Sequence, residues 1–139
     1  MSTQQPELEW RQILSSAGPY PLEAFQFVRD GLSYTVASLH PDEPEEPTAE
    51  LGASRHVSGQ QLCMGLRDYA ISQFGLLAPT VLEHWHIRRS DDFGRIVFAM
   101  IEHGLMSKTE EDTLDDFRGV YDFDEAFSPE ALAARIGTR

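Results

Sequence analysis

This sequence has little cysteine, little positive charge and no long apolar run. Its 139 residues include one cysteine, 11 lysine and arginine residues against 23 acidic residues, and no membrane-length apolar stretch. A single cysteine cannot form an intramolecular disulfide, so a reducing cytoplasm is the expected compartment. The missing apolar run excludes a membrane-spanning helix, and the first residues lack the basic and apolar regions of a secretory signal.

The apolar content is nevertheless high enough for a folded chain. Apolar residues make up 41% of the sequence and aromatic residues 10%, while the net charge is −12. Disordered chains of such charge have fewer apolar and aromatic residues. At this length about two thirds of the unfolded surface can be buried without a disulfide or metal. We therefore expect residues 1–139 to form a single domain.

The acidic residues gather in two segments. Residues 41–50 contain five acids, no base and three prolines. With so few apolar side chains to bury, we expect residues 41–56 to form a flexible, acidic, proline-rich loop. Residues 107–127 contain eight acids and two bases, interleaved with aromatic residues.

Apolar spacing and capping residues predict a mainly α-helical, multi-helix domain. Ser58 and Gln61 are spaced as a capping box, Ser90 and Thr109 are the expected N-caps of two later helices, and Ser128 precedes a last helix in a tail over 128–139 that frays. We expect helices over about 6–16, 21–39, 58–75, 79–85, 91–103 and from 129 onward.

Residues 32–36 allow a second interpretation. Their sequence, LSYTV, is rich in strand-favouring residues. A helix that ended at Gly31 would leave them as a strand. Helical apolar spacing from Leu22 to Leu39 favours the continuous helix instead.

The helix over 91–103 has the clearest apolar face of the chain. The inward positions are Phe93, Ile96, Val97, Met100 and Ile101, and the outward positions are Gly94, Arg95, Phe98, Ala99 and Glu102. An exposed aromatic residue such as Phe98 is typical of a surface that a second element or a partner covers. Phe98 and Arg95 are therefore candidate partner-binding residues.

Distinctive strings between Tyr20 and Phe127 carry a family resemblance. They include Tyr20-Pro21, Glu23-Ala24-Phe25, the run from His56 to Cys63, Gly65-Leu66-Arg67, Asp92-Phe93-Gly94-Arg95-Ile96-Val97-Phe98 and Val120-Tyr121-Asp122-Phe123. In these strings the chain resembles a family of small uncharacterised proteins of planctomycete and verrucomicrobial bacteria. The resemblance implies a bacterial protein and supplies no activity.

Residues 78–108 also resemble a winged helix-turn-helix. The match consists of a short helix to Trp85, a turn to Ser90, a second helix over 91–103, and a small β element near 105–108 as the first wing strand. The resemblance implies nucleic-acid binding through Arg88, Arg89, Arg95 and Lys108. An acidic chain must concentrate its few cations to bind phosphates, and on the outward face only Arg95 suits a base edge. Nucleic-acid binding is therefore the alternative hypothesis.

The histidines and the cysteine give little support for a metal or catalytic site. His84 and His86 lie two residues apart, which on a helix points them in different directions. No metal-binding anchor joins them to His56, Cys63 or His103. Cys63 lies beyond the first helical turn, so a small buried cysteine is the expected role. We expect no metal ion and no cofactor.

The acids of residues 112–125 do not match a calcium-binding loop, which needs alternate ligands and a central glycine. Their aromatic neighbours predict a segment that docks on the core with its acids in water, where they could bind a basic partner. The sequence thus predicts a cytoplasmic protein-interaction or adaptor domain. Its candidate partner-binding residues are Phe98, Arg95, Asp115, Asp116, Asp122 and Asp124.

Motifs of nucleotide binding or hydrolysis are absent from the sequence. No phosphate-binding glycine loop and no nucleophile elbow occurs. Catalytic groups distant in sequence leave no such local trace. An enzyme with an unrecognised site is therefore the third hypothesis.

Overall fold

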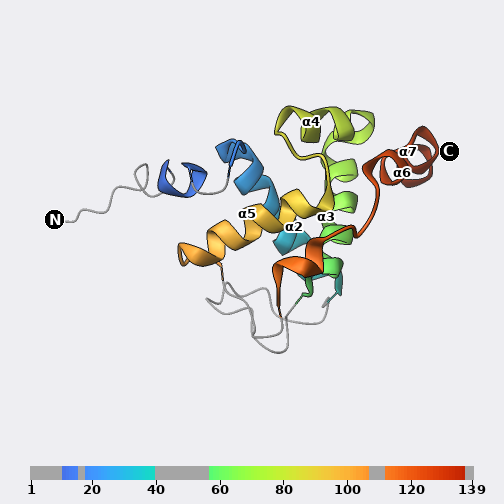
Figure 1. Ribbon diagram of the computed structural model, residues 1–139. Coiled ribbons are helices and arrows are strands. Elements are labelled where there is room, and N and C mark those ends of the chain that lie inside the picture. The colour runs from blue at the N-terminus through green and yellow to red at the C-terminus, as the bar shows by residue number, and fades with distance from the viewer. Residues whose placement is uncertain (1–10, 16–17, 40–56, 107–111, 137–139) are drawn as a thin grey trace.

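The computed structural model describes residues 11–15, 18–39, 57–106 and 112–136 (Figure 1). Within these ranges the chain forms helices and turns and no strand, which confirms the mainly α-helical fold. None of these helices combines the length and apolar character needed to cross a membrane. The elements are α2 (Leu22–Leu39), α3 (Gly59–Phe74), η2 (Gly75–Leu77), α4 (Ala78–His84), α5 (Ser90–Glu102), η3 (Leu114–Phe117), α6 (Phe123–Ala126) and α7 (Pro129–Ile136).

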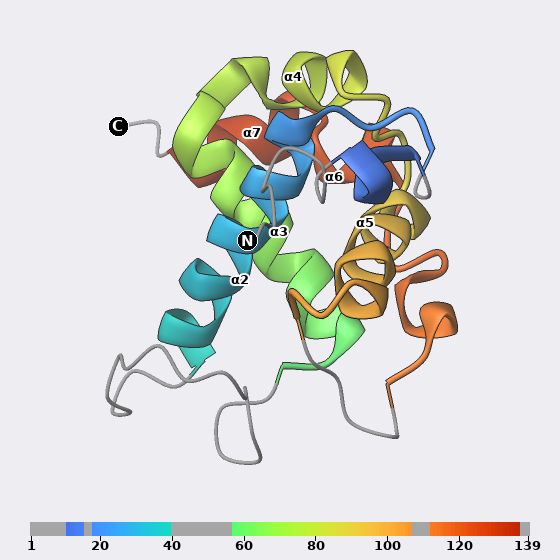
Figure 2. The ribbon, with the colours of Figure 1, turned by 90° about the vertical axis from the view of Figure 1, so that its left-hand side faces the viewer.

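The helices α2 and α3 pack side by side, as Figure 2 shows. Glycines allow the close approach: a Cβ atom at Gly65 would collide with the side chain of Thr35, and one at Gly31 would collide with Leu66. Thr35 donates its hydroxyl to the carbonyl of Gly31 at 2.7 Å. Gly31 therefore makes a helix contact and does not end α2, so the strand alternative for residues 32–36 is wrong.

The start of α3 is the one that the sequence predicts. The hydroxyl of Ser58 accepts a hydrogen bond from the backbone N–H of Gln61 at 3.1 Å. In return, the Gln61 side-chain oxygen accepts the N–H of Ser58 at 3.0 Å. These two bonds satisfy N–H groups that the helix itself leaves without acceptors.

Replacing Ser58 with alanine should remove half of this capping box. We expect a loss of about 1 kcal/mol in the free energy of unfolding, measured by urea denaturation. Substitution by threonine, which retains the hydroxyl, should cost less. An alanine variant as stable as the native protein would show that the cap contributes nothing.

The ends of α4 and α5 share one hydrogen-bonding pattern. After α5, Leu105 donates its N–H to the carbonyl of Met100, and Gly104 donates to Ile101. Gly104 has a φ of 77°, which suits glycine at this position of a Schellman motif. After α4 the same position is occupied by His86, with a φ of 65°. The left-handed turns fix where each helix ends.

The helix α5 points its apolar face inward, as the sequence predicts. Ile96 and Met100 are 0% exposed, whereas Arg95 is exposed. They belong to a core to which α2, α3, α4 and the C-terminal segment all contribute. Its fully buried members include Ile13, Phe25, Val28, Leu66, Leu82 and Phe93.

The expected outward face of α5 is partly wrong. Gly94 and Ala99 are buried, and Phe98 is half-buried. The reason is η3, which packs against α5: a Cβ at Gly94 would lie 2.8 Å from the Phe117 side chain. The rings of Phe98 and Phe117 meet edge to face with centroids 6.3 Å apart. A second element of the same chain therefore covers this face.

Several sequence predictions fall partly or wholly outside the described ranges. They are the loop over 41–56, the capped start at Thr109, the first helix over 6–16, of which residues 11–15 are described and helical, and the wing strand at 105–108, of which Leu105 and Met106 form a bend. The last helix is present as α7, and the hydroxyl of Ser128, directly before it, accepts the N–H of Ala131 at 3.1 Å. Residues 137–139 lie outside the described part.

Candidate functional site

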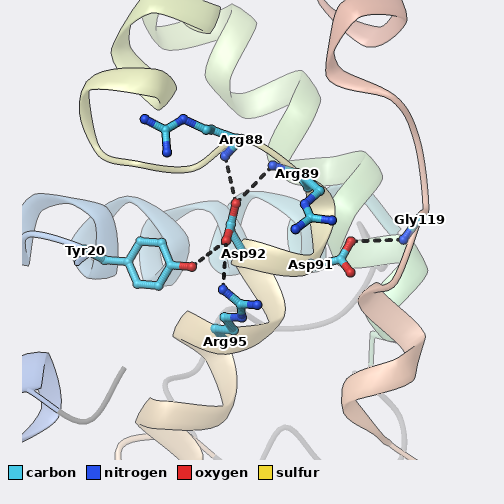
Figure 3. Close-up of polar contacts among 7 residues, drawn as sticks. All are labelled: Tyr20, Arg88, Arg89, Asp91, Asp92, Arg95 and Gly119. Carbon is cyan, nitrogen blue, oxygen red and sulfur yellow. Dashed lines mark hydrogen bonds and ion pairs between the residues drawn. The ribbon is translucent and has the colours of Figure 1, made fainter. Parts of the chain in front are cut away.

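A buried carboxylate organises the turn between α4 and α5 (Figure 3). Asp92 is 8% exposed, and its Oδ2 accepts the backbone N–H groups of Arg88 and Arg89 at 2.8 and 3.0 Å. Its Oδ1 accepts the hydroxyl of Tyr20, and lies 3.6 Å from Nη1 of Arg95. Every partner is a donor, so the burial of this charge is compensated.

The Asp92 network fixes the backbone of Arg88 and Arg89, two of the four residues that the sequence singles out for nucleic-acid binding. Arg88 and Arg89 are exposed, and Figure 3 shows their guanidinium groups pointing in different directions. Arg95 is 54% exposed at its side chain and pairs with Asp92. Lys108 lies outside the described residues. The three arginines therefore lie near one turn without converging on one point.

The first residues of α5 also bind the segment that follows η3. Ser90 donates its hydroxyl to the carbonyl of Phe117 at 2.7 Å and accepts the N–H of Val120 at 2.9 Å. Asp91 accepts the N–H of Gly119 at 3.1 Å. The prediction that Ser90 caps α5 is wrong, because its hydroxyl bonds a distant segment and Arg89 occupies the N-cap position.

Burial and the hydrogen bond to Asp92 raise the pKa of Tyr20 from 10 to about 12. Because the folded state holds this proton more tightly, its contribution to stability is complete below about pH 10 and is lost as pH rises toward 12. We therefore expect the native protein to lose more unfolding free energy than Tyr20→Phe between about pH 9 and about pH 11, measured by urea denaturation. Equal losses in both proteins would contradict this coupling.

The four acidic candidate residues lie in two groups, one on η3 and one at the start of α6, and Figures 1 and 2 both show these two segments apart. Asp115 and Asp116 belong to η3, beside α5. Asp122 precedes α6 and accepts the N–H of Asp124 at 2.8 Å. The expected docking of this segment is confirmed, because Phe117 and Phe127 are 3% and 5% exposed. Asp115, Asp122 and Asp124 are exposed, and Asp116 is half-buried.

The first group adjoins the α5 candidates. A cavity of about 110 Å³ is lined by Arg95, Asp115 and Arg118, together with Asp91 and Leu114. Asp115 and Arg118 form an exposed ion pair at 3.2 Å. Exposed pairs of this kind contribute little to stability. The structure thus brings Arg95 and Asp115 together, as two of the predicted partner-binding residues.

The second group borders a larger groove between α4 and the pair α6 and α7. Its volume is about 430 Å³. The groove contains three charged side chains, Glu83, Arg88 and Asp124. Its apolar lining comes from Pro79, Ile87, Phe123, Phe127 and Pro129. Below, this site is called the α4–α6 groove.

The structure does not bring the described histidines and the cysteine together. His84, His86 and His103 are exposed, Cys63 is 0% exposed, and His56 lies outside the described ranges. In the part of the chain that the structure describes, no three His, Cys, Asp or Glu side chains could hold one metal ion. Burial, with a smaller effect from Asp91, raises the pKa of Cys63 from 9 to about 12.

Cys63 should therefore be unreactive in the folded protein. The thiolate is the nucleophilic form, and both burial and the raised pKa suppress it. Ellman's reagent at neutral pH should label the denatured protein fully and the native protein only as fast as it unfolds. Rapid native labelling would contradict the buried position and revive the hypothesis of a cysteine nucleophile.

Sequence reasoning missed Tyr20 and, apart from Arg88 and Asp124, the residues that line the α4–α6 groove. Asp92 carried a usable signal, since an acid at the third helical position commonly accepts an N–H at the N-cap. Tyr20 carried none, because 72 residues separate it from Asp92. The groove likewise joins residues 79–88 to residues 123–129.

Comparisons with protein-family models, with curated proteins and with solved structures found no match to this chain. The two resemblances seen in the sequence therefore stay predictions. The geometry of the described residues carries the functional argument from here.

Proposed function

We propose that this protein is an interaction module that binds a basic segment of another protein. The binding surface is the acidic segment, residues 112–125. The observation that carries the proposal is its anchoring: Phe117 and Phe127 are buried, while Asp115 and Asp124 beside them are exposed. A basic partner thus meets carboxylates whose backbone is already fixed, which lowers the entropy cost of binding.

The charge of the chain supports a cationic partner. The net charge of −12 attracts cations over a distance and speeds their encounter with the surface. A reducing cytoplasm is the compartment that we propose, since the one cysteine is buried and free. A bacterial origin, from the family resemblance, belongs to the same proposal.

A nucleic-acid-binding regulator of winged-helix type is the second candidate. It is favoured by Arg88 and Arg89, which are exposed on a turn that Asp92 holds in place. It is disfavoured by the divergence of their guanidinium groups in Figure 3 and by the pairing of Arg95 with Asp92. Phosphate binding requires cations that act together.

Fluorescence anisotropy with two labelled probes separates the candidates. The probes are an oligolysine peptide and a short DNA duplex, each titrated with the full chain at low and at physiological salt. We expect the peptide to bind and its affinity to fall as salt rises, because the attraction is between exposed charges. We expect no binding of the duplex.

Two triple variants that remove the same number of charges from different surfaces show which surface binds the peptide. One neutralises acids of the acidic segment, with the substitutions Asp115→Asn, Asp124→Asn and Glu125→Gln. The other removes equal charge from α2 and α5, with the substitutions Glu23→Gln, Asp30→Asn and Glu102→Gln. All six side chains are exposed. The first variant should lose about tenfold in affinity and the second much less. Equal losses, or binding of the duplex alone, would overturn the proposal.

A further inference from the structure

The α4–α6 groove has an apolar floor that is already in place. Ile87 and Phe127 are 1% and 5% exposed, and Phe123 packs its ring 5.2 Å from that of Phe127 and 6.0 Å from that of Phe93. The N–H of Ile87 bonds the carbonyl of Leu82 at 2.9 Å, which fixes the other wall to the end of α4. A ligand that binds in this groove would therefore not have to immobilise the side chains at its bottom, because they are already packed.

The groove is large enough for part of a peptide. Its volume of about 430 Å³ lies in the range of roughly 300 to 1,000 Å³ that ligand pockets span. A bulky apolar side chain fills only part of such a space. An apolar anchor that fills a pocket is also the feature that dominates the affinity of many protein interfaces.

The charges of the groove favour a cationic ligand. Glu83 and Asp124 are exposed carboxylates, and Arg88 is the cation among the described lining residues. No ion pair joins any of these three side chains to another described residue. Their charges are therefore not neutralised within the part of the protein that the structure describes, and negative charge exceeds positive.

We propose that the α4–α6 groove binds a short partner segment in which an aromatic or large aliphatic side chain is flanked by lysine or arginine. The apolar side chain contacts Phe123, Pro79 and Pro129, which are the accessible apolar residues of the lining. The flanking cations face Glu83 and Asp124. This assignment rests on the proposed function, because it gives the basic partner a docking site at one end of the acidic segment. It predicts that Arg88 weakens the binding of such a segment, since it opposes the incoming cations.

The test compares two labelled peptides and three variants of the full chain by fluorescence anisotropy. One peptide is lysine-rich with central phenylalanines, and the other has serines in their place. The variants are Asp124→Lys at the groove, Glu102→Lys on α5 as the matched charge reversal outside the acidic segment, and Arg88→Gln. Arg88, Glu102 and Asp124 have exposed side chains, so these substitutions leave the core intact.

The groove predicts a specific pattern. The phenylalanine peptide should bind about tenfold more tightly than the serine peptide. Asp124→Lys should weaken it about tenfold, Glu102→Lys by less than about twofold, and Arg88→Gln should strengthen it. Equal effects of Asp124→Lys and Glu102→Lys, or equal binding of both peptides, would rule out the groove as the docking site and leave the proposed function standing. Failure of both peptides to bind would overturn the proposed function itself.

Discussion

Replacing Ile96 with alanine should destabilise the protein by roughly 2 to 5 kcal/mol. Ile96 is 0% exposed on the inward face of α5, between residues of the core. Alanine would forfeit the transfer free energy of the lost methyl and methylene groups and would leave a cavity in a close-packed interior. Urea denaturation with a linear extrapolation measures the loss.

The matched substitution is Arg95→Ala on the neighbouring, outward position. Its side chain is 54% exposed, so we expect a loss below about 1 kcal/mol. If Ile96→Ala cost less than about 0.5 kcal/mol while Arg95→Ala cost more, α5 would be turned the other way. The assignment of Arg95 to the surface would then fail as well.

Replacing Asp92 with alanine should cost about 3 kcal/mol or more. The substitution removes the acceptor of the Tyr20 hydroxyl and of the N–H groups of Arg88 and Arg89. Buried donors left without an acceptor lose their hydration with no compensation. The variant should also lose less stability than the native protein as Tyr20 ionises at alkaline pH, because the hydrogen bond to Asp92 adds to the effect of burial on the pKa of Tyr20.

The control for this substitution is the adjacent acid, Asp91. Asp91→Ala removes one described hydrogen bond, from the N–H of Gly119, and should cost about 1 kcal/mol. Both residues lie in the first turn of α5, so the helix dipole affects them alike. Similar losses for the two variants would show that Asp92 stabilises the protein only through its charge in the first turn of α5 and that its hydrogen bonds add nothing.

Local signals in the sequence predicted the helices well and their side-chain partners poorly. The capping box of Ser58 and Gln61 involves residues three apart, so its spacing alone identifies it. Ser90 carries the same kind of signal, but its hydroxyl bonds Phe117 and Val120, 27 and 30 residues away. A cap and a tertiary hydrogen bond compete for one hydroxyl, and the sequence does not show which one forms.

Glycine gave a similarly ambiguous signal. Gly104 ends α5 through a left-handed turn, as its position after the apolar stripe predicts. Gly31 allows the same interpretation, yet α2 continues through it because Leu66 of α3 occupies the space that a side chain would need. Close approach of two helices and termination of one helix both favour glycine.

The candidate site was predictable only in part. Alternation of acids and aromatic residues correctly predicted that the acidic segment docks on the core, because burial of Phe117 and Phe127 follows from their chemistry. The two groups of acids and the α4–α6 groove depend on how α6 packs near α4. That arrangement is set by tertiary contacts, which apolar periodicity does not encode.

Hydrogen–deuterium exchange with and without the lysine-rich, phenylalanine-containing peptide tests the central claim most directly. The method reports which backbone segments become protected when the peptide binds. The account predicts slower exchange in residues 79–88 and 121–129, the two walls of the α4–α6 groove, and no change in α2. Protection confined to other segments, with exchange in both walls unchanged under saturating peptide, would contradict it.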